Sequence, residues 1–253
     1  MTIDRRHFLK VAAAGVVTGL TPKFAAAGSV PIKAIAFDGF PVFDPKSVFA
    51  KTEALFPGKG MELATAWRSR LFEYQWLRVV GGQYADFWKI GQDSLAFAAK
   101  MLSLDMTTKK SDEIMHGFLE MKAWPDALPV LTALKKAGIR MAFLSNLTSN
   151  VLDASIKSAG LDGIFEPSLT TDRIKSYKPD PRAYQLGLDA FKLKREEIAF
   201  AASSGWDAAG AKWFGYPTVW INRQKQPVEE LSTPPDLVTT DLSGLAEFVK
   251  ATH

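Results

Sequence analysis

An apolar run that ends abruptly at a carboxylate constrains the fold of this chain more than any other feature. Residues 34–37 read Ala-Ile-Ala-Phe, a continuous apolar segment typical of a central strand that is buried on both faces. Asp38 follows at once, and Gly39 and Pro41 end the strand. Ligands of open α/β sheets bind beyond the carboxyl ends of the strands, so Asp38 lies at a candidate site. An Asp that only starts a turn is the plainer interpretation, and residues further along decide between the two.

The first 27 residues have the pattern of an export signal. Charged residues at 4–10 precede an apolar run at 11–20 and small residues up to Ala27. The pattern Arg5-Arg6-x-Phe8-Leu9-Lys10 resembles a twin-arginine signal, which the translocation machinery reads as an address and which does not anchor the chain. The apolar run is shorter than the roughly 20 residues that a membrane-spanning helix needs. We therefore predict cleavage near Ala27, no stable membrane anchor and a mature protein in the bacterial periplasm.

The net charge and the rare residue types exclude several classes of site. The chain has a formal net charge of +4, and removal of the leader's four cations and one anion leaves +1, so nothing indicates nucleic acid as a partner. Cysteine is absent, which excludes a thiol nucleophile, a thiolate metal site and disulfides. The three histidines are His7 in the leader, His116 and the last residue, His253. This distribution argues against a histidine triad and a multi-histidine metal site.

A helical stretch separates the first strand from the rest of the chain. Residues 61–80 and 84–101 carry apolar side chains three and four positions apart, and residues 45–122 contain little that reads as a strand. The many aromatic side chains in this stretch are interpreted as packing between helices. Arg68, beside Trp67, is better explained as a solvated helix charge when it is taken alone.

Alternating helix and strand patterns return near residue 124. Strands are predicted at residues 139–144, 164–169, 198–202 and, as the final strand, 216–221. Helices are predicted at residues 128–136, 149–158, 182–191 and 208–214. This alternation predicts a parallel sheet with right-handed crossovers, interrupted once by the helical insertion.

Polar residues follow the predicted strands at their carboxyl ends. They are Asp38, Ser145, Asn146, Lys178 and, in a loop at 203–207, Asp207. A lysine between two carboxylates keeps both ionised, whereas two unpaired carboxylates a few ångströms apart would raise one pKa. Asp38 is then a candidate nucleophile that forms a covalent ester, and Asp207 is a candidate for activating the water that opens it. Ser145 and Asn146 offer donors for a substrate carboxylate or phosphate.

With these residues in place, the chain resembles the haloacid dehalogenase superfamily and, within it, the type II L-2-haloacid dehalogenases. The resemblance covers essentially the whole mature chain. It is carried by Phe37-Asp38, Ala66-Trp67-Arg68, residues 71–77, Leu144-Ser145-Asn146, Tyr177-Lys178-Pro179-Asp180 with Tyr184, and residues 206–211, 214–217 and 220–223. It implies an α/β fold in which a Rossmann-like parallel sheet core, at 28–43 and 124–253, carries an all-helical cap at 44–123 inserted after the first strand.

The resemblance also implies a reaction and a role for each site residue. Asp38 would attack C2 of an L-2-haloalkanoate with inversion, and water would hydrolyse the ester to a D-2-hydroxy acid, which is (S)-2-haloacid dehalogenase activity. Lys178 would balance the acids, Tyr184 would orient the pocket, and Asp207 would position or deprotonate the water. The residues expected to bind the substrate or the halide are Gly39, Phe40, Arg68, Phe87, Ser145, Asn146, Ser204 and Trp206. No cofactor is implied, and a homodimer through the aromatic cap helices is a candidate assembly.

Two features separate this chain from the phosphatases that share the core. Those phosphatases usually carry a second Asp two residues after the nucleophile, where this chain has Phe40. Residues 203–207 read Ser-Ser-Gly-Trp-Asp and contain one carboxylate, fewer than a magnesium ion usually recruits. We therefore expect a metal-free site.

Two loops depart from the pattern usual in the dehalogenases. Residues 39–43 are one residue short and lack a Gly-Thr pair, which removes a hydroxyl expected beside Asp38. Ala202 stands where a hydroxyl is usual, and Ser204 where an amide is usual. Both losses affect the water-activating half of the cycle, so alkylation of Asp38 is better supported than turnover of the ester. Two alternatives stay open: another hydrolase of the same fold, such as a phosphatase or a dehalogenase with a shifted substrate, and a non-catalytic binding protein.

Overall fold

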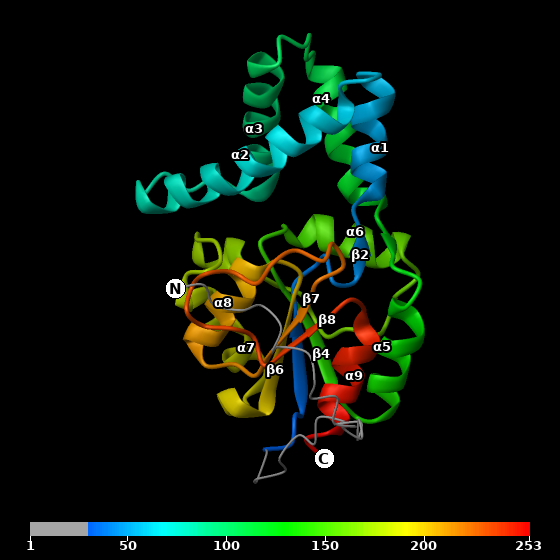
Figure 1. Ribbon diagram of the computed structural model, residues 1–253, viewed down its shortest axis with the longest axis vertical. Helices are drawn as coiled ribbons and strands as arrows, with labels where there is room; N and C mark the ends of the chain where they lie inside the picture. The colour runs from blue at the N-terminus through cyan, green and yellow to red at the C-terminus, as the bar shows by residue number, and fades with distance from the viewer. Residues whose placement is uncertain (1–29) are drawn as a thin grey trace, which may run out of the picture.

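A parallel sheet forms the core of the computed structural model, which describes residues 30–253 (Figure 1). Its six strands have the order β5-β4-β1-β6-β7-β8, and each neighbouring pair is parallel. The strands are β1 (Ala34–Phe37), β4 (Arg140–Ser145), β5 (Leu169–Thr170), β6 (Ile198–Ala202), β7 (Thr218–Ile221) and β8 (Leu237–Thr239). The predicted α/β fold with a parallel sheet is confirmed. The predicted leader at 1–27 lies outside the described residues.

The strand β1 lies inside the sheet because both of its faces are apolar. Ala34 and Ala36 point to one helical layer and Ile35 and Phe37 to the other, following the alternation of side chains along a strand. The alanine face is covered by α7 (Pro181–Phe191) and α8 (Gly205–Phe214). The opposite face is covered by α5 (Ala127–Lys136), α6 (Ser149–Ser158) and α9 (Leu242–Lys250) (Figure 1).

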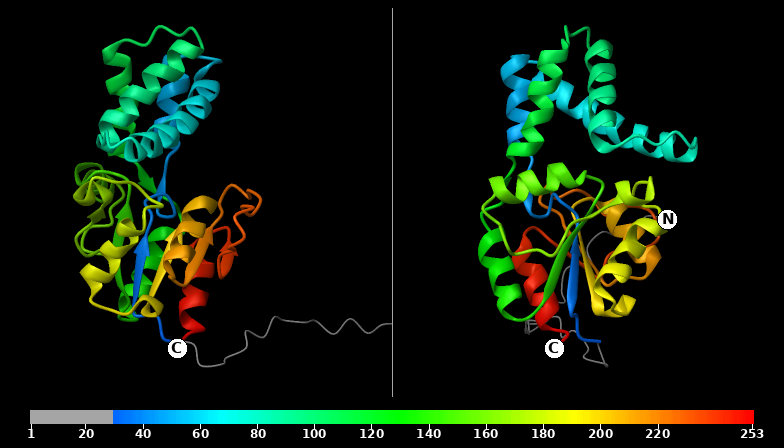
Figure 2. Two further views of the ribbon diagram at one scale, coloured as in Figure 1. Left: turned by 90° about the vertical axis from the view of Figure 1, so that its left-hand side faces the viewer. Right: turned by 180° about the vertical axis from the view of Figure 1, so that it is seen from behind.

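Four further helices, here called the cap, stand beyond the carboxyl ends of the strands (Figures 1 and 2). They are α1 (Lys46–Leu55), α2 (Gly60–Val80), α3 (Phe87–Met101) and α4 (Thr108–His116), followed by the 3-10 helix η1 (Gly117–Glu120). The predicted helices at 61–80 and 84–101 thus correspond to α2 and α3. Strand β2 (Phe43–Asp44) pairs antiparallel with β3 (Lys122–Ala123), so the chain enters and leaves the cap at one place. Within residues 30–253, no helix has both the length and the apolar character needed to cross a bilayer.

Local sequence signals set where several helices begin and end. Asp86, Asp180 and Asp241 precede α3, α7 and α9, and each side chain accepts a hydrogen bond from a backbone amide two or three residues later. Pro181 occupies the first turn of α7, where its missing N–H is no loss. Gly215 ends α8 with a φ of 98°, a left-handed conformation that glycine adopts without strain.

The structure differs from the sequence prediction in three places. The strand predicted at 164–169 is reduced to β5, because Ile164 and Phe165 lie in a turn and Phe165 instead packs on Phe143, with ring centroids 4.2 Å apart. The strand predicted as the last is followed by β8 and α9; β8 has three residues at the edge of the sheet, too few for a periodic signal. Asp207 lies in the first turn of α8 and not in a loop, because that helix already begins at Gly205.

Candidate functional site

The candidate site lies at the point where the order of the strands reverses. From β1 the chain continues to β4 and β5 on one side and then to β6, β7 and β8 on the other, so the switch point is at the carboxyl ends of β1 and β6. Asp38 follows β1 directly, and Ser203 follows β6 directly. The backbone N–H of Asp38 donates to the carbonyl oxygen of Ala201 at 3.0 Å, which holds the two strand ends side by side. The cap covers this end of the sheet (Figure 2).

Lys178 lies at the centre of the site, in the segment between the 3-10 helix η2 (Thr171–Ile174) and α7. Its side chain is 1% exposed. The ammonium nitrogen donates to Asp38 Oδ1 at 2.9 Å, to Asp207 Oδ2 at 2.6 Å and to the carbonyl oxygen of Leu144 at 3.2 Å. Burial lowers the pKa of Lys178, but the two carboxylates raise it above its ordinary value, so the lysine stays protonated. The structure thus brings Asp38, Lys178 and Asp207 together.

The Asp38 carboxylate has hydrogen-bond donors on both oxygens. Oδ1 accepts from Lys178, while Oδ2 accepts from the Ser203 hydroxyl at 2.6 Å and, at a long 3.4 Å, from the backbone N–H of Phe40. Burial raises the pKa of Asp38, but the charge of Lys178 and the hydrogen bonds outweigh it and hold the pKa below its ordinary value. Asp38, only 8% exposed, is therefore an ionised carboxylate with little solvation, a state suited to a nucleophile.

Ser203 is a site residue that the sequence analysis missed. The same rule that selects Asp38, a polar residue directly after a buried strand, applies to Ser203 after β6 and would have found it. The shortened loop at 39–43 was expected to remove a hydroxyl from beside Asp38. The structure places the Ser203 hydroxyl on that carboxylate, so Asp38 does have a hydroxyl partner.

Asp207 is held from two sides. Lys178 contacts Oδ2, and the hydroxyl of Tyr184 donates to Oδ1 at 2.7 Å. Burial raises the pKa of Asp207 to about 6, although Lys178 opposes this and Asp38 adds to it. A Cβ at Gly210 would lie 2.5 Å from the Tyr184 oxygen, so this glycine leaves the room that Tyr184 needs. Asp207 is therefore an oriented carboxylate that changes its charge near neutral pH, as a general base requires.

Ser145, the last residue of β4, lies close to the loop that follows Asp38. It is 1% exposed, and its hydroxyl accepts a hydrogen bond from the backbone N–H of Leu147 at 3.2 Å. A Cβ at Gly39 would lie 3.6 Å from that hydroxyl oxygen and 3.1 Å from the Leu147 side chain. The absence of a side chain at Gly39 thus leaves room for the Leu147 side chain beside this loop.

Asn146 links the sheet to the cap. Its Oδ1 accepts from the backbone N–H of Lys178 at 3.0 Å, so its amide nitrogen faces the cap and donates to Gln75 Oε1 at 3.0 Å. Gln75 lies on α2, is fully buried, and was not predicted as a site residue. Within the described chain, its own amide nitrogen is buried without a hydrogen-bond partner.

Three aromatic rings connect the cap to the segments that carry the site. Trp206, which precedes Asp207, makes edge contacts with Phe72 at 5.3 Å and Trp76 at 5.4 Å between ring centroids, both on α2. The indole N–H of Trp76 donates to the carbonyl oxygen of Lys178 at 3.1 Å. The aromatic residues of α2 therefore pack against the two segments that carry Lys178 and Asp207.

Three predicted binding residues make no side-chain hydrogen bond to this cluster within residues 30–253. Arg68 is exposed on α2, 5.5 Å from the centroid of the Phe72 ring. Phe87 is buried inside the cap, where its ring packs edge-on against Phe118 at 5.1 Å. Ser204 precedes α8 without a side-chain hydrogen bond to that helix. Their roles toward substrate or halide stay predictions.

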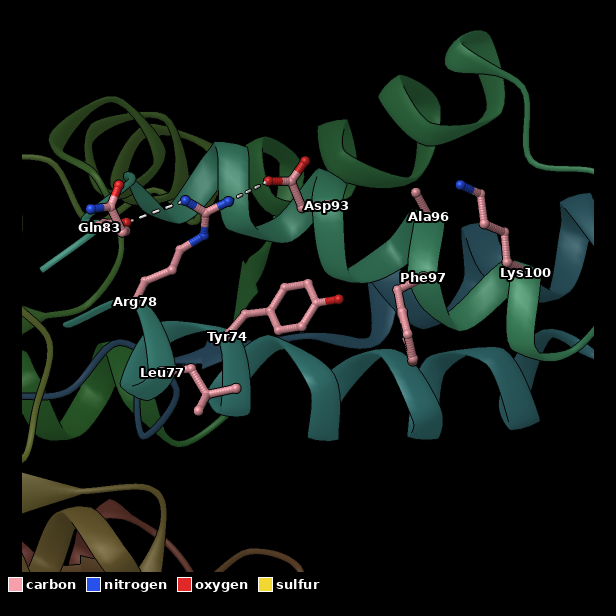
Figure 3. A pocket seen from close by; sticks show the side chains of 8 residues that line it. All are labelled: Tyr74, Leu77, Arg78, Gln83, Asp93, Ala96, Phe97 and Lys100. Carbon is pink, nitrogen blue, oxygen red and sulfur yellow. Dashed lines mark hydrogen bonds and ion pairs between the residues drawn. The ribbon is translucent and has the colours of Figure 1, made fainter. Parts of the chain in front are cut away.

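A pocket on the cap is separate from the site (Figure 3). It lies between α2 and α3 and is lined by Tyr74, Leu77, Arg78, Gln83, Asp93, Ala96, Phe97 and Lys100. Arg78 spans it, donating to the Gln83 carbonyl oxygen at 3.2 Å and to Asp93 at 3.1 Å (Figure 3). None of the predicted site residues lines this pocket.

The geometry at the strand ends suits a two-step displacement. Asp38 is an ionised carboxylate at the switch point, Asp207 is a second carboxylate with a pKa of about 6, and Lys178 pairs with both. A carboxylate can form an ester with a substrate carbon, and a second carboxylate can deprotonate the water that hydrolyses this ester. The arrangement therefore provides a nucleophile and a base within one buried ion-pair network.

Known proteins share both this sequence and this fold. A family described as haloacid dehalogenase-like hydrolase matches residues 48–215. An (S)-2-haloacid dehalogenase of Pseudomonas sp. (strain YL) is 37% identical over 86% of this chain and 94% of its own length. Haloacetate dehalogenase H-2 of Moraxella sp. (strain B) is 35% identical over 86% of this chain and 98% of its own length. The solved structure of the L-2-haloacid dehalogenase of Xanthobacter autotrophicus superposes with a TM-score of 0.81 at 30% identity, covering 87% of this chain and 98% of that one.

The strand-end placement of Asp38, Lys178 and Asp207 and the similarity along most of the chain lead to the same assignment. The chain belongs to the haloacid dehalogenase-like hydrolase family.

Proposed function

We propose that this protein is an (S)-2-haloacid dehalogenase, a hydrolase that acts on carbon–halide bonds and converts L-2-haloalkanoates to D-2-hydroxy acids and halide. The single observation that carries the proposal is the buried Lys178 ammonium, which bonds Asp38 at 2.9 Å and Asp207 at 2.6 Å. The relatives named (S)-2-haloacid dehalogenase, similar over most of the chain, support the substrate class.

In the first step, Asp38 attacks C2 of the substrate. A carbon–oxygen bond forms as the carbon–halogen bond breaks, and the halide leaves with the bonding electrons. The low exposure of Asp38 favours this step, because a carboxylate nucleophile is more reactive when little water solvates it. Attack from the side opposite the halide inverts C2, so an L-substrate yields a D-product.

In the second step, Asp207 takes a proton from the water that attacks the ester. Tyr184 and Lys178 orient the Asp207 carboxylate, and its pKa of about 6 leaves it mostly ionised at neutral pH. Collapse of the intermediate releases the hydroxy acid and restores the Asp38 carboxylate. Ser145 and the backbone N–H of Gly39 are proposed to hold the substrate carboxylate, and Asn146 and Arg68 to surround the departing halide, since Phe87 is buried inside the cap.

The test is free halide released from L- and D-2-chloropropionate and from chloroacetate by the mature protein, without added metal, together with the intact mass of the protein. Catalytic release from the L form but not from the D form is expected. Asp38→Asn keeps the shape of the side chain without a nucleophilic carboxylate and should release no halide, while Asp44→Asn, a carboxylate at the base of the cap, serves as the matched control. Phosphate release that depends on Mg²⁺, in place of halide release, would instead identify a phosphatase.

We further propose that the protein is exported through the twin-arginine pathway and works in the periplasm after loss of residues 1–27. The charged, apolar and small-residue order of this segment, with Arg5-Arg6 before Phe8, supports the proposal.

A homodimer through the cap helices is also proposed. Leu77 and Val80 near the end of α2 and Met101 at the end of α3 are exposed, with Val80 88% exposed. Light scattering of the mature protein should give twice the mass of the chain, and a monomer at all concentrations would refute this assembly.

A further inference from the structure

Ser203 makes the shorter of the two hydrogen bonds to Asp38 Oδ2, and the two-step reaction proposed above gives it no role. Its hydroxyl oxygen lies 2.6 Å from that carboxylate oxygen, a length typical of a hydroxyl that donates to an ionised acceptor. An ionised carboxylate has no hydrogen to donate, so the proton of this bond belongs to Ser203.

The position of Ser203 is fixed by the sheet. The residue follows β6, whose register aligns Ala201 with Phe37 next to Asp38. The indole N–H of the buried Trp220 on β7 donates to the backbone carbonyl of Ser203 at 3.1 Å. A donor held by two neighbouring strands is preorganised and does not have to reorient when charge develops on its partner.

The two oxygens of Asp38 have different surroundings. Oδ1 faces the Lys178 cation, which is also paired with Asp207. Oδ2 faces a neutral hydroxyl and, at 3.4 Å, the backbone N–H of Phe40. When Oδ1 is alkylated it loses its charge, and Lys178 keeps Asp207 as its counter-ion. Oδ2 then becomes the carbonyl oxygen of the ester and keeps both of its donors.

We propose that Oδ1 is the attacking oxygen and that Ser203, with the Phe40 N–H, forms the oxyanion hole for hydrolysis of the ester, an inference that rests on the proposed dehalogenase function. Water adds to Cγ of Asp38 and gives its proton to Asp207, and the electrons of the carbonyl bond move onto Oδ2. Ser203 stabilises this negative charge. The bond between Cγ and Oδ1 then breaks, Oδ1 leaves with the product as its hydroxyl oxygen, and Asp207 returns the proton to it. The second proton of the water remains on the new Asp38 carboxyl and passes to solvent, which restores the Asp38 carboxylate with one oxygen from water.

The test compares the two steps in Ser203→Ala. Loss of one oxyanion donor typically lowers the rate of the step that it serves by about 10²–10³. Rapid mixing with L-2-chloropropionate should therefore release about one halide per protein at a rate within about tenfold of wild type, followed by slow turnover, and intact mass should show the ester accumulating on Asp38. Ser203→Thr retains a hydroxyl and should restore most of the turnover. Ser203→Cys, which keeps the shape with a slightly larger atom and a weak donor, provides a second loss variant should the alanine disturb folding.

Ser155→Ala is the matched control, since Ser155 is a buried serine of α6 whose hydroxyl bonds the Phe118 carbonyl oxygen at 2.9 Å, away from the site. The Ser155→Ala variant should complete both steps of the reaction, so that no ester accumulates on Asp38. The inference is overturned if Ser203→Ala shows no ester, or if its halide burst slows as much as its turnover, because the hydroxyl would then act only on the first step. No halide release from the wild-type protein would instead refute the dehalogenase function itself, and this inference with it.

Discussion

Charge is distributed unevenly among the residues of the site. Lys178, Asp38 and Asp207 together carry a net charge of −1 in a region with almost no solvent. Two neutral hydroxyl groups compensate for the water that is excluded, since Ser203 donates to Asp38 and Tyr184 to Asp207. The pKa values of the two carboxyls consequently move in opposite directions, below the ordinary value for Asp38 and to about 6 for Asp207. Paired groups whose pKa values are pushed apart in this way are suited to different roles.

This separation predicts different pH dependences for the two steps. Asp207 acts as a base only when ionised, so ester hydrolysis should slow at a pH below about 6, because the Asp38 charge that helps to raise the pKa of Asp207 is absent from the ester. Asp38 stays ionised over the same range, because its pKa lies below the ordinary value. Single-turnover measurements between pH 5 and 8 should therefore show a nearly constant halide burst and an ester that persists longer at low pH. A burst that declines in parallel with turnover would contradict these assignments.

At the scale of elements, the segment from α2 to α3 holds the cap against the core. Four hydrogen bonds cross between them: the Asn146 amide to Gln75 already described, the Trp76 indole to the Lys178 carbonyl, the Tyr84 hydroxyl to Asp172 at 2.9 Å, and the Tyr177 hydroxyl to the Ala85 carbonyl at 2.8 Å. The rings of Tyr84 and Tyr177 also stack, with centroids 5.4 Å apart. Gln75 also disfavours docking of the cap on the core, because its buried side-chain amide nitrogen has no hydrogen-bond partner in the described chain.

Removing one of these contacts should weaken the docking of the cap on the core and leave the reacting residues Asp38, Lys178 and Asp207 unchanged. Tyr84→Phe deletes a hydrogen bond worth about 1 kcal/mol net, so kcat/KM for L-2-chloropropionate should fall about three- to tenfold while the folded state is retained. Tyr74→Phe is the matched control, since no hydrogen bond of the Tyr74 hydroxyl is found in residues 30–253. Steady-state kinetics and a thermal melt of both variants decide the point, and equal kcat/KM values in the two would show that the contact does not affect closure.

Two kinds of feature could be predicted from the sequence. They are helices with a long hydrophobic periodicity and residues whose position follows a general rule of the fold. The helices α2 and α3 have sustained periodicity, and Asp38, Lys178 and Asp207 follow from the rule that ligands bind beyond the carboxyl ends of parallel strands. Strands of two or three residues, such as β2 and β8, are too short to show a period. Contacts between distant segments, such as Asn146 with Gln75, depend on how the cap docks, which no local pattern encodes.

For the whole molecule, the proposed export predicts the cell compartment in which the protein is found and the length of its mature chain. In a bacterium with a twin-arginine pathway, the wild-type chain should appear in the periplasm without residues 1–27. Replacing Arg5 and Arg6 together by Lys keeps the charge but removes the paired arginines, and should leave the 27.8 kDa precursor in the cytoplasm. Cell fractionation and intact mass provide the measurement, with Lys23→Arg as the control. Periplasmic mature protein from the double variant would show that another route exports it.

The pairing of β2 with β3 gives the molecule a mechanical property. These adjacent two-residue strands are where the backbone passes into the cap and back, so the cap can turn about this connection as one body once its contacts with the core break. A helix of the length of α2, 21 residues, spans about 30 Å. Rotation by about 10° at one end of such a lever moves its far end by about 5 Å, enough to admit a three-carbon acid. A small torsion at these four residues would therefore displace the far end of α2, where Trp76 contacts Trp206, by several ångströms.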